Sequence, residues 1–361
     1  MRVVFYAPTY RMWVPFNPAN ILDKMIGGGE TYLMMGAKAL GEAGHRVKVY
    51  VPQGSGVFGN VSYHDTSERI TDCDVLVCCE TDNNTGHVES DYRMIACQCN
   101  DPSIFHRVDY CLVPSVWLGK YINEHYRVKL NKMVVIPDAT FSELYDRNDI
   151  DKVRGRLIYA SSPDRGLHHL LRIFPKIKKK VTEAHLRIFY AFWPQFEANK
   201  YGMDITSEIY WKIRRSMNQE GVEYVGPVGK RQLAEEELSS ELLVYPEDTI
   251  RPTEGFGITY ADMLAARVAI VAPDVDAVGE VWGDYIALMP PPPHNDKDWV
   301  DITVELLRDE SLRRKYYEAG REKVFQDYTW AAVGEKWVKL LERIKEERDV
   351  DNAIEPALAV K

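Results

Sequence analysis

Short apolar runs rich in β-branched residues alternate with segments of helical periodicity along almost the whole chain. Such alternation is typical of a parallel α/β sheet with helices on both of its faces. In the first half of the sequence, strands are predicted by the runs RVVFYA, RVKVYVP, DVLVCC, MIACQC, YCLVPS and NKMVVIP. Helices are predicted by GGGETYLMMGAKALGEAG, which ends at a glycine stop signal, and by SVWLGKYINEHY.

The same pattern starts again after the polar stretch DATFSELYDRNDIDKVRG, which we interpret as a domain linker. Further strands are predicted by GRLIYASS, HLRIFYAF, VEYVG, ELLVYP, VAIVA and YIALMP. The predicted helix RGLHHLLRIFPKIKKK contains Pro175, which indicates an interruption or a kink. Two long charged helices are predicted over 298–325 and 329–347, and 349–361 is interpreted as a frayed tail.

The length of the chain, 361 residues, is too great for one ordinary hydrophobic core. We therefore predict two doubly wound, Rossmann-like α/β domains that face each other across a cleft, with bounds 1–145 and 146–330. Residues 331–361 are expected to form a C-terminal helix that packs back on the first domain, followed by the tail. Ligands of such sheets bind beyond the carboxyl ends of the strands.

The stretch TEGFGITYAD at 253–262 joins a predicted strand to a predicted helix through a glycine-rich turn. Glycine permits positive φ and lets the backbone approach a ligand closely. Unpaired amides at a helix start favour phosphate, which makes this turn a candidate phosphate site formed by Gly255, Phe256, Gly257 and Ile258. Glu254 has no helix of its own to cap, and this indicates a functional role.

Three other positions are candidates for ligand contact. Asp262 lies at capping-box spacing after Thr259, so a helix cap and a ligand contact both stay open for it. Arg165, at a predicted strand-to-helix turn, can bind a diphosphate bidentately. Gly28 and Gly29 open the first long helix, where a flexible joint or a tight turn is the alternative to a binding loop.

Four segments of the chain resemble retaining glycosyltransferases of the GT-B fold, in family 4 (glycosyl transferases group 1), which use nucleotide-sugar donors. The resemblance rests on GGGE at 27–30, YASSPDRGLHHLL at 159–171, VEYVGPVGKRQLAEEELSSELLVYP at 222–246 and TEGFGITYADMLAARVAIVAPDVDAVGEV at 253–281. The last segment matches the E-x7-E element of the family, with Asp262 in the second acidic place.

The resemblance implies transfer of a sugar from a nucleotide-diphosphate sugar, UDP- or GDP-linked, to a hydroxyl of a glycan, lipid or small molecule. It implies retention of the anomeric configuration, with the leaving phosphate accepting the acceptor proton, and neither a cofactor nor a metal. By the same likeness, Glu254 contacts the donor sugar and Asp262 the ribose, while Arg165 and the Gly28/Gly29 loop offset charge on the diphosphate.

The sequence departs from the family pattern in two places. The family usually has a second cation just before the position of Arg165, where this chain has Ala160, Ser161 and Ser162. Lys230 and Arg251 are the candidates to replace it. Many relatives also have a histidine in the first domain, near the acceptor. The corresponding stretch MIACQCNDPS offers Asp101, for which a polar or proton-accepting role and a turn start both stay open.

The net charge of −9 and the absence of a basic stripe argue against nucleic acid as a partner. No apolar run is long enough to span a membrane, so we expect a cytoplasmic protein for which peripheral membrane contact stays open. Asp72-Cys73-Asp74 precedes a strand and is interpreted as a turn, and the cysteines as free thiols. His87, His106, His168 and His169 are interpreted as surface or packing residues.

Three other functions are alternatives. A nicotinamide-dependent oxidoreductase needs a G-x-G-x-x-G turn directly after the first strand, and this chain has nearly twenty residues between that strand and GGGE. A GT-B-fold module that binds nucleotide sugars without turnover stays open because a cation and a histidine are missing. A sugar-nucleotide epimerase or a phosphorylase on the same fold also stays open.

Overall fold

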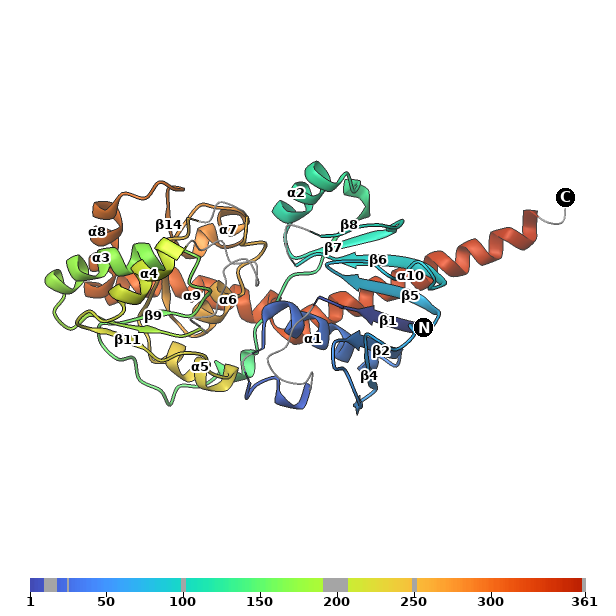
Figure 1. Ribbon diagram of the computed structural model, residues 1–361, viewed down its shortest axis with the longest axis horizontal. Coiled ribbons are helices and arrows are strands. Elements are labelled where there is room, and N and C mark those ends of the chain that lie inside the picture. Colours follow the sequence, from blue (N-terminus) through green and yellow to red (C-terminus); the bar gives the residue numbers. More distant parts are fainter. Residues whose placement is uncertain (10–17, 25, 99–101, 191–206, 249–251, 359–361) are drawn as a thin grey trace.

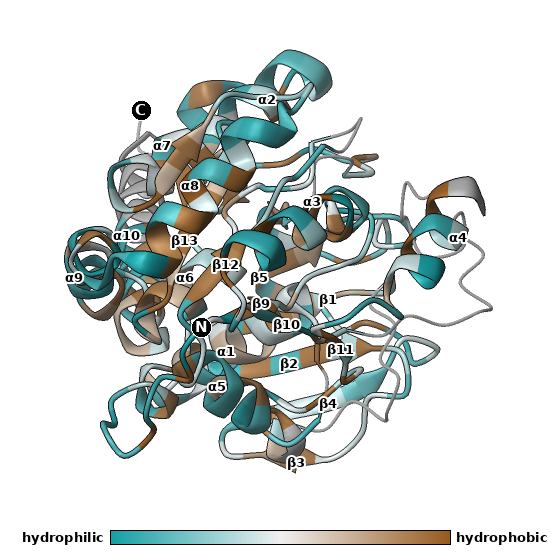
Figure 2. Ribbon diagram, turned by 90° about the vertical axis from the view of Figure 1, so that its left-hand side faces the viewer, coloured by the Kyte–Doolittle hydropathy of each residue, from teal (hydrophilic) through white to brown (hydrophobic). Residues whose placement is uncertain are grey.

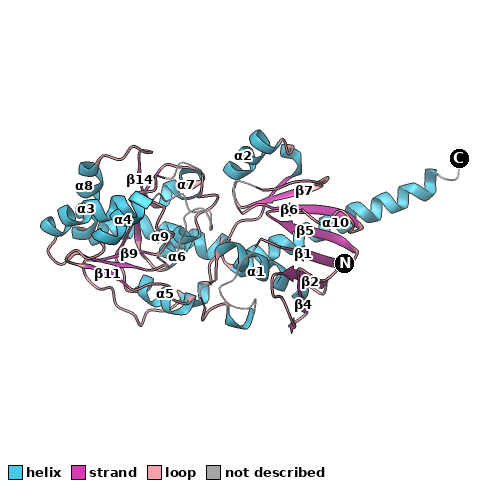
Figure 3. Ribbon diagram, in the orientation of Figure 1, coloured by secondary structure: helices cyan, strands magenta, loops and turns pink. Residues whose placement is uncertain are grey.

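The computed structural model describes residues 1–9, 18–24, 26–98, 102–190, 207–248 and 252–358. Its strands form two sheets, and each sheet is the centre of one lobe (Figure 1). We call the part built on the eight-stranded sheet the first lobe and the part built on the six-stranded sheet the second lobe. Helices flank the strands in both lobes (Figure 3). The prediction of two doubly wound α/β sheets is therefore confirmed.

The first sheet has the strand order β3-β4-β2-β1-β5-β6-β7-β8, and its pairs are parallel except for β3 with β4. Its strands are β1 Arg2–Tyr6, β2 Arg46–Val51, β3 Val57–Phe58, β4 Val61–Asp65, β5 Cys73–Cys79, β6 Ser90–Ala96, β7 Tyr110–Val113 and β8 Met133–Val135. The helices of this part of the chain are α1 Gly28–Glu42 and α2 Val116–Tyr126, with short 3-10 turns η1 Pro18–Asn20 and η2 Leu130–Lys132.

The second sheet is parallel throughout and has the order β11-β10-β9-β12-β13-β14. Its strands are β9 Arg156–Tyr159, β10 His185–Ile188, β11 Val222–Tyr224, β12 Leu242–Val244, β13 Ala269–Pro273 and β14 Ala287–Met289. The remaining helices are α3 Leu167–Lys180, α4 Ser207–Ser216, α5 Lys230–Leu238, α6 Ile258–Ala265, α7 Val278–Trp282, α8 Asp296–Arg308, α9 Glu310–Asp327 and α10 Trp330–Leu358, with 3-10 turns η3 Ser142–Leu144 and η5 Gly283–Tyr285.

The central strands are buried on both faces, and this explains their continuous apolar runs. All five residues of β13 are buried, and so are six of the seven residues of β5. In Figure 2 the brown of apolar residues follows β12 and β13, whereas the outer helices α5 and α9 are largely teal. The edge strand β3 and its neighbour β4 were not predicted. In β4, Ser62 and His64 interrupt the apolar pattern, because this strand is buried on one side only.

The order of the second sheet creates a switch point between its two central strands. β9 and β12 are neighbours, but the chain leaves β9 toward β10 and leaves β12 toward β13 on the other side. The two connections therefore diverge at the carboxyl ends and leave a crevice, which is where ligands of doubly wound sheets bind. Arg165 follows β9 and Glu254 follows β12, so both candidates lie at this crevice.

Three helix predictions need correction. The predicted helix over 298–325 is two helices, because Asp309 adopts extended backbone angles and its side chain accepts a hydrogen bond from the Leu312 amide as the cap of α9. α3 continues through Pro175 and is not interrupted. The predicted frayed tail is wrong up to Leu358, since α10 runs to that residue.

Helix α10 leaves the second lobe and runs along the first (Figure 1). The indole ring of Trp337 is fully buried there, with ring centroids 5.6 Å from both Phe5 and Tyr32. A side chain at Gly36 of α1 would meet this ring at 3.0 Å, so the glycine lets the two helices approach closely. The domain bounds 1–145 and 146–330 stay a proposal that follows the extents of the two sheets.

The chain passes between the lobes twice, and the two passages lie side by side. The first is the segment between β8 and β9, and the second joins α9 to α10. Thr140 and Thr329 form an isolated parallel bridge, and the Thr140 amide donates to the Tyr328 carbonyl at 2.9 Å. The predicted polar linker is thus packed against the second passage, and it contains the 3-10 turn η3.

Candidate active site

Arg165 and Glu254 meet at the carboxyl ends of β9 and β12. Arg165 Nη1 donates to Glu254 Oε1 in an ion pair. The Glu254 side chain is 3% exposed and that of Arg165 is 29% exposed. The arginine thus closes one side of the buried carboxylate and still reaches the crevice. A guanidinium in this position can pair with a second anion, because its planar fork has five N–H donors.

The Tyr245 hydroxyl also binds the Glu254 carboxylate, at the same oxygen as Arg165. The Tyr245 hydroxyl, 3.1 Å from Glu254 Oε1, donates to it, and Ser161 Oγ lies 2.7 Å from the same hydroxyl. Burial raises the pKa of Glu254, whereas the positive charge of Arg165 and the hydrogen bonds from Tyr245 and Arg165 oppose the rise. The carboxylate is therefore held in one orientation by groups that stabilise its charged form.

The glycine-rich turn around Glu254 is anchored by Asp276. Asp276 Oδ2 accepts from the amides of Thr253 at 2.7 Å and Glu254 at 3.1 Å. Gly257 caps the start of α6. Its φ of +87° is a backbone angle that residues with L side chains rarely adopt. The sequence places glycine where the chain must reverse from the carboxylate into the helix.

The Phe256 side chain belongs to the core. It is 2% exposed, and its ring centroid lies 5.2 Å from that of Trp282 and 5.0 Å from that of Tyr328. Its carbonyl accepts from Trp282 Nε1 at 2.6 Å. Of this residue only the amide is left for a ligand, and that role stays a prediction, as do those of the Gly257 and Ile258 amides.

The turn that carries Arg165 is packed against the end of β12. Gly166 has φ +79°, and a Cβ at this position would lie 1.9 Å from the Pro246 carbonyl oxygen. The buried Tyr159 hydroxyl lies 2.8 Å and 2.9 Å from the carbonyl oxygens of Ser162 and Arg165. Only glycine permits this close approach, which brings the start of α3 against the strand that leads to Glu254.

Four other predicted site residues line a cavity of about 30 Å³ between the lobes. Gly28, Lys230, Ile258 and Asp262 come from α1, α5 and α6, and they face residues 138–141, 144 and 145 of the linker. The Thr140 hydroxyl donates to Asp262 Oδ1. Burial raises the pKa of Asp262 to about 6, against the positive charge of Lys230.

Asp138, which the sequence analysis did not select, lines the same cavity. Burial raises its pKa to about 7, with Lys230 opposing the rise and the Glu80 carboxylate adding to it. Lys230 therefore lies among several carboxyl groups, and its Nζ is 5.9 Å from the Phe141 ring centroid. This amine is placed to neutralise acids at the cavity as well as to meet a ligand.

The lobes touch around these two groups of residues. A Cβ on Gly255 would lie 3.1 Å from Leu118 Cδ2 of the first lobe, and one on Gly28 would lie 3.9 Å from Ile258 Cγ2 of the second. The Val116 amide donates to Glu280 Oε1 at 2.9 Å.

Three predicted site residues remain to be placed. Gly29 lies in the first turn of α1 and is half-buried. Asp101 and Arg251 lie outside the described residues.

Glu247 is an acidic residue of the site that the sequence analysis missed. It is fully buried, and the Thr253 hydroxyl donates to its Oε1. Its pKa is raised to about 8, mainly by burial and in addition by the nearby charge of Glu254, whereas the positive charge of Arg165 opposes the rise. The signal for it was available, since an acid directly after the strand run ELLVYP falls at the carboxyl end of a parallel strand.

The structure also tests the interpretation of several residues outside the crevice. Asp74 pairs with Arg2 at 3.0 Å, and Asp72 Oδ1 accepts from the Glu89 amide at 3.0 Å, so Asp74 serves an ion pair and Asp72 links two segments 17 positions apart instead of forming a local turn. The five described cysteines are buried free thiols. His168 and His169 were interpreted as surface or packing residues, but both lie half-buried against Asp248. Among the described residues, no helix has the length and apolar character needed to cross a membrane.

The match to a known protein family lies in the second lobe. Residues 157–323 match the family model described as Glycosyl transferases group 1. A segment of 91 residues is 33% identical to a phosphatidyl-myo-inositol mannosyltransferase of Mycobacterium leprae, and it covers 25% of this chain. The chain thus matches only 24% of the length of that curated relative.

Solved structures show the same fold over nearly the whole chain. Sucrose-phosphate synthase from Thermosynechococcus elongatus superposes with a TM-score of 0.72 at 13% identity, covering 96% of this chain and 100% of that one. Anabaena HepE, solved with UDP and glucose, has a TM-score of 0.67 at 11% identity, covering 95% and 100%. HepE has also been solved with UDP-glucose. The two sheets and the superpositions agree that the chain has the GT-B fold, and its residues 157–323 match the Glycosyl transferases group 1 family.

Proposed function

We propose that this protein transfers a glycosyl unit from a nucleotide-diphosphate sugar, with UDP as the expected nucleotide, to an acceptor hydroxyl with retention of the anomeric configuration. The observation that carries the proposal is the Arg165–Glu254 ion pair at the switch point of the second sheet. Arginine is suited to a diphosphate, and a fixed buried carboxylate is suited to orient sugar hydroxyls. UDP and glucose bound to HepE, which has the same fold, favour UDP as the nucleotide.

In the proposed reaction, the bond between the anomeric carbon and the diphosphate oxygen breaks while the acceptor oxygen attacks the same face of the sugar. The acceptor proton passes to the leaving phosphate, so no nucleophile from the protein is needed. Arg165 and the amides at the starts of α3 and α6 offset the charge that develops on the diphosphate. Glu254 orients the sugar ring.

The residues of the interlobe cavity complete the proposal for the donor. Asp262 is the candidate for the ribose hydroxyls, and Lys230, at the start of α5, is the candidate for the second cation. The Gly28/Gly29 loop faces them from the first lobe. Because these groups supply cationic and amide stabilisation, we propose a transfer step that is independent of metal and of any cofactor. The acceptor is proposed to approach from the first lobe, where Asp101 stays the candidate for a polar contact.

The donor screen that tests this function uses the purified full chain. Thermal unfolding midpoints are measured with UDP-, GDP- and ADP-linked sugars, and the hits are incubated with hydroxyl acceptors in the presence of EDTA. NMR of the product reports the anomeric configuration. We expect one nucleotide class to raise the midpoint and an α-linked donor to give an α-linked product. Nucleotide binding without hydrolysis or transfer for any donor would support the inactive module instead, and a C2 or C4 epimer or a sugar 1-phosphate among the products would support an epimerase or a phosphorylase.

A further inference from the structure

Three side chains with metal-ligand chemistry meet on the second lobe. His168 and His169 lie in the first turn of α3, and Asp248 follows β12. Asp248 Oδ2 lies 2.6 Å from His169 Nε2 and 3.4 Å from His168 Nε2. One ligand atom from each residue lies within 4.8 Å of the others, and no second group of this kind occurs in the described parts of the chain.

This cluster is partly enclosed and incompletely hydrogen-bonded. The two histidine side chains are 16% exposed and that of Asp248 is 22% exposed. The Nδ1 atoms of both histidines are buried and have no hydrogen-bond partner. Both imidazole rings direct Nε2 at the same carboxylate oxygen of Asp248. Each neutral ring has one hydrogen-bond donor and one acceptor, so the available partners do not satisfy both rings. A cation between the three groups would use the lone pairs of both rings and the charge of the carboxylate.

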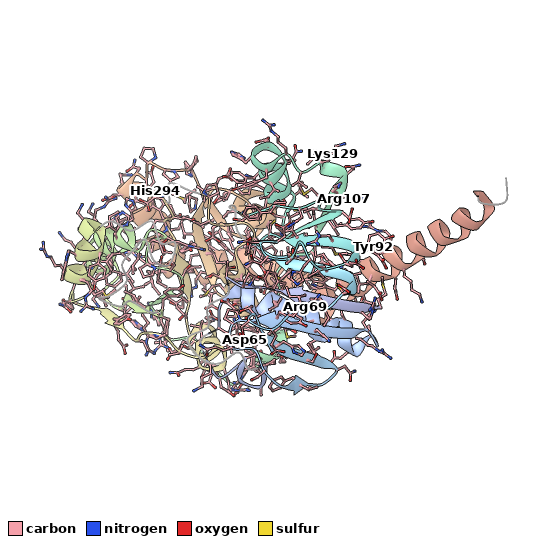
Figure 4. The ribbon with its side chains drawn as sticks, turned by 45° about the vertical axis from the view of Figure 1, so that its right-hand side comes forward. Asp65, Arg69, Tyr92, Arg107, Lys129 and His294 are labelled. Atoms are coloured by element: carbon pink, nitrogen blue, oxygen red, sulfur yellow. The ribbon has the colours of Figure 1, made fainter. Side chains whose placement is uncertain are left out.

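A third imidazole stands beside the cluster. The His294 ring centroid lies 5.3 Å from that of His169, and His294 Nε2 is 2.8 Å from the Glu247 carbonyl oxygen. Figure 4 labels His294 on the second lobe, far from Arg107 and Lys129 on the first. Its Nδ1 atom is also buried and without a partner. Imidazole is thus the dominant polar group at this place, and imidazole ligands favour zinc, copper and nickel over magnesium and calcium.

We propose that His168, His169 and Asp248 bind one Zn²⁺ ion. Tetrahedral zinc holds nitrogen and oxygen ligands at about 2.0–2.2 Å, so its ligand atoms lie about 3.3–3.6 Å from one another. The His168–Asp248 separation of 3.4 Å already fits this geometry, and the His169–Asp248 contact of 2.6 Å needs to open by less than 1 Å. Two imidazoles and one carboxylate leave the fourth position to water, as in three-ligand zinc sites.

The surrounding charges are compatible with a cation. Arg172 and Lys176, the nearest basic residues along α3, are both paired with Asp296, at 2.6 Å and 2.9 Å. Their positive charge is therefore offset before an ion enters.

The ion would join α3 to the chain that leads to Glu254. Asp248 follows Glu247, whose carboxylate accepts from Thr253, the residue before Glu254. A bound Zn²⁺ would thus hold Asp248, the neighbour of Glu247, against the first turn of α3. This role is structural and lies beyond the proposed transfer reaction, which needs no metal.

Calorimetric titration with ZnCl₂ tests the proposal on the full chain, freed of any histidine tag, treated with EDTA and dialysed. We expect one Zn²⁺ per chain, and Co²⁺ in its place should give the intense visible absorption of tetrahedral coordination. His169→Gln and Asp248→Asn should each weaken zinc binding at least tenfold, because even the loss of an outer-shell partner commonly weakens it tenfold to a hundredfold. The matched control is His125→Gln, on the exposed face of α2, which should bind zinc as the unmodified chain does.

A second readout separates a lost ligand from a lost fold. Zinc should raise the thermal unfolding midpoint of the unmodified chain and of His125→Gln, but not that of the two ligand variants. If His169→Gln unfolds without metal, His168→Gln takes its place, because its contact with Asp248 is longer. Absence of zinc binding in the unmodified chain, or zinc affinity in His168→Gln and Asp248→Asn equal to that of the unmodified chain, would overturn the proposal. Neither result depends on whether the chain transfers a sugar.

Discussion

Arg165 and Glu254 form an ion pair across 89 positions of the sequence, because β9 and β12 are neighbours in the second sheet. The pair joins the turn before α3 to the turn before α6. Both helix starts therefore lie at the same edge of the sheet as the guanidinium. The first two predictions test this pair.

Glu254→Gln keeps the shape of the side chain and removes its charge. We expect donor turnover to fall about a hundredfold or more, the usual order for a positioned group that acts on developing charge, while the affinity for UDP stays nearly unchanged. Steady-state kinetics and calorimetry measure the two quantities. Glu235→Gln, an exposed acid on α5, is the control with unchanged turnover. Normal turnover in Glu254→Gln would remove this residue from the mechanism.

Arg165→Ala should weaken the binding of UDP more than that of uridine. The guanidinium is proposed to bind the diphosphate, and hydrogen bonds to charged groups contribute about 1.5–3 kcal/mol, or roughly tenfold to a hundredfold in affinity. Calorimetry with both ligands measures the difference. Arg172→Ala, on the helix α3 that follows Arg165, should leave both affinities unchanged, since Arg172 pairs with Asp296. An equal loss for UDP and uridine in Arg165→Ala would indicate that Arg165 supports the structure only.

Gly166→Ala should destabilise the second lobe strongly. The added Cβ would lie 1.9 Å from the Pro246 carbonyl oxygen, at a φ of +79°. Gly44→Ala is the matched control, since Gly44 has φ +87° and open space around the new Cβ. We expect the control to lose about 1–2 kcal/mol from the backbone angle alone, and Gly166→Ala to lose clearly more. Urea unfolding measures both, and equal losses would show that the contact with Pro246 relaxes easily.

Asp138→Asn should change how stability depends on pH. Burial raises the pKa of Asp138 in the folded chain to about 7, from about 3.9 when unfolded, so the folded state binds the proton more tightly. Its contribution to stability is present below pH 4 and is lost as pH rises to 7. The asparagine variant cannot ionise, so it should gain stability relative to the unmodified chain between pH 5 and pH 8, by about 1 kcal/mol or more. Urea midpoints at the two pH values measure the gain, and the same difference at both would contradict the prediction.

Sequence patterns predicted the parts of the fold that depend on neighbouring residues. The central strands were recognisable because burial on both faces requires continuous apolar runs, as in β13. Asp309 was a readable signal that was overlooked, since an aspartate before a helix pattern is a typical N-cap. The strand β4 was missed because polar residues alternate with its apolar ones.

The site was predictable only where strand ends could be located. Arg165 and Glu254 follow apolar runs directly, and parallel strands bring their carboxyl ends to one edge. The contact of Thr140 with Asp262 joins residues 122 positions apart, and that of His169 with Asp248 joins residues 79 apart. Such contacts depend on how the linker and α3 pack in three dimensions, and local spacing contains no information about that packing.

The bridge between Thr140 and Thr329 determines how the two lobes can move. Both covalent connections between the lobes run together at this bridge. An opening motion of the two lobes must therefore rotate about this edge, which acts as the hinge. The interlobe cavity of about 30 Å³ has room for a water molecule or two. Drug-sized ligands occupy pockets of about 300–1,000 Å³, so a nucleotide can enter there only after such a swing. Donor binding at this cavity would then depend on lobe opening, and a crosslink between the lobes, placed opposite the Thr140–Thr329 bridge, should abolish donor binding by preventing that opening.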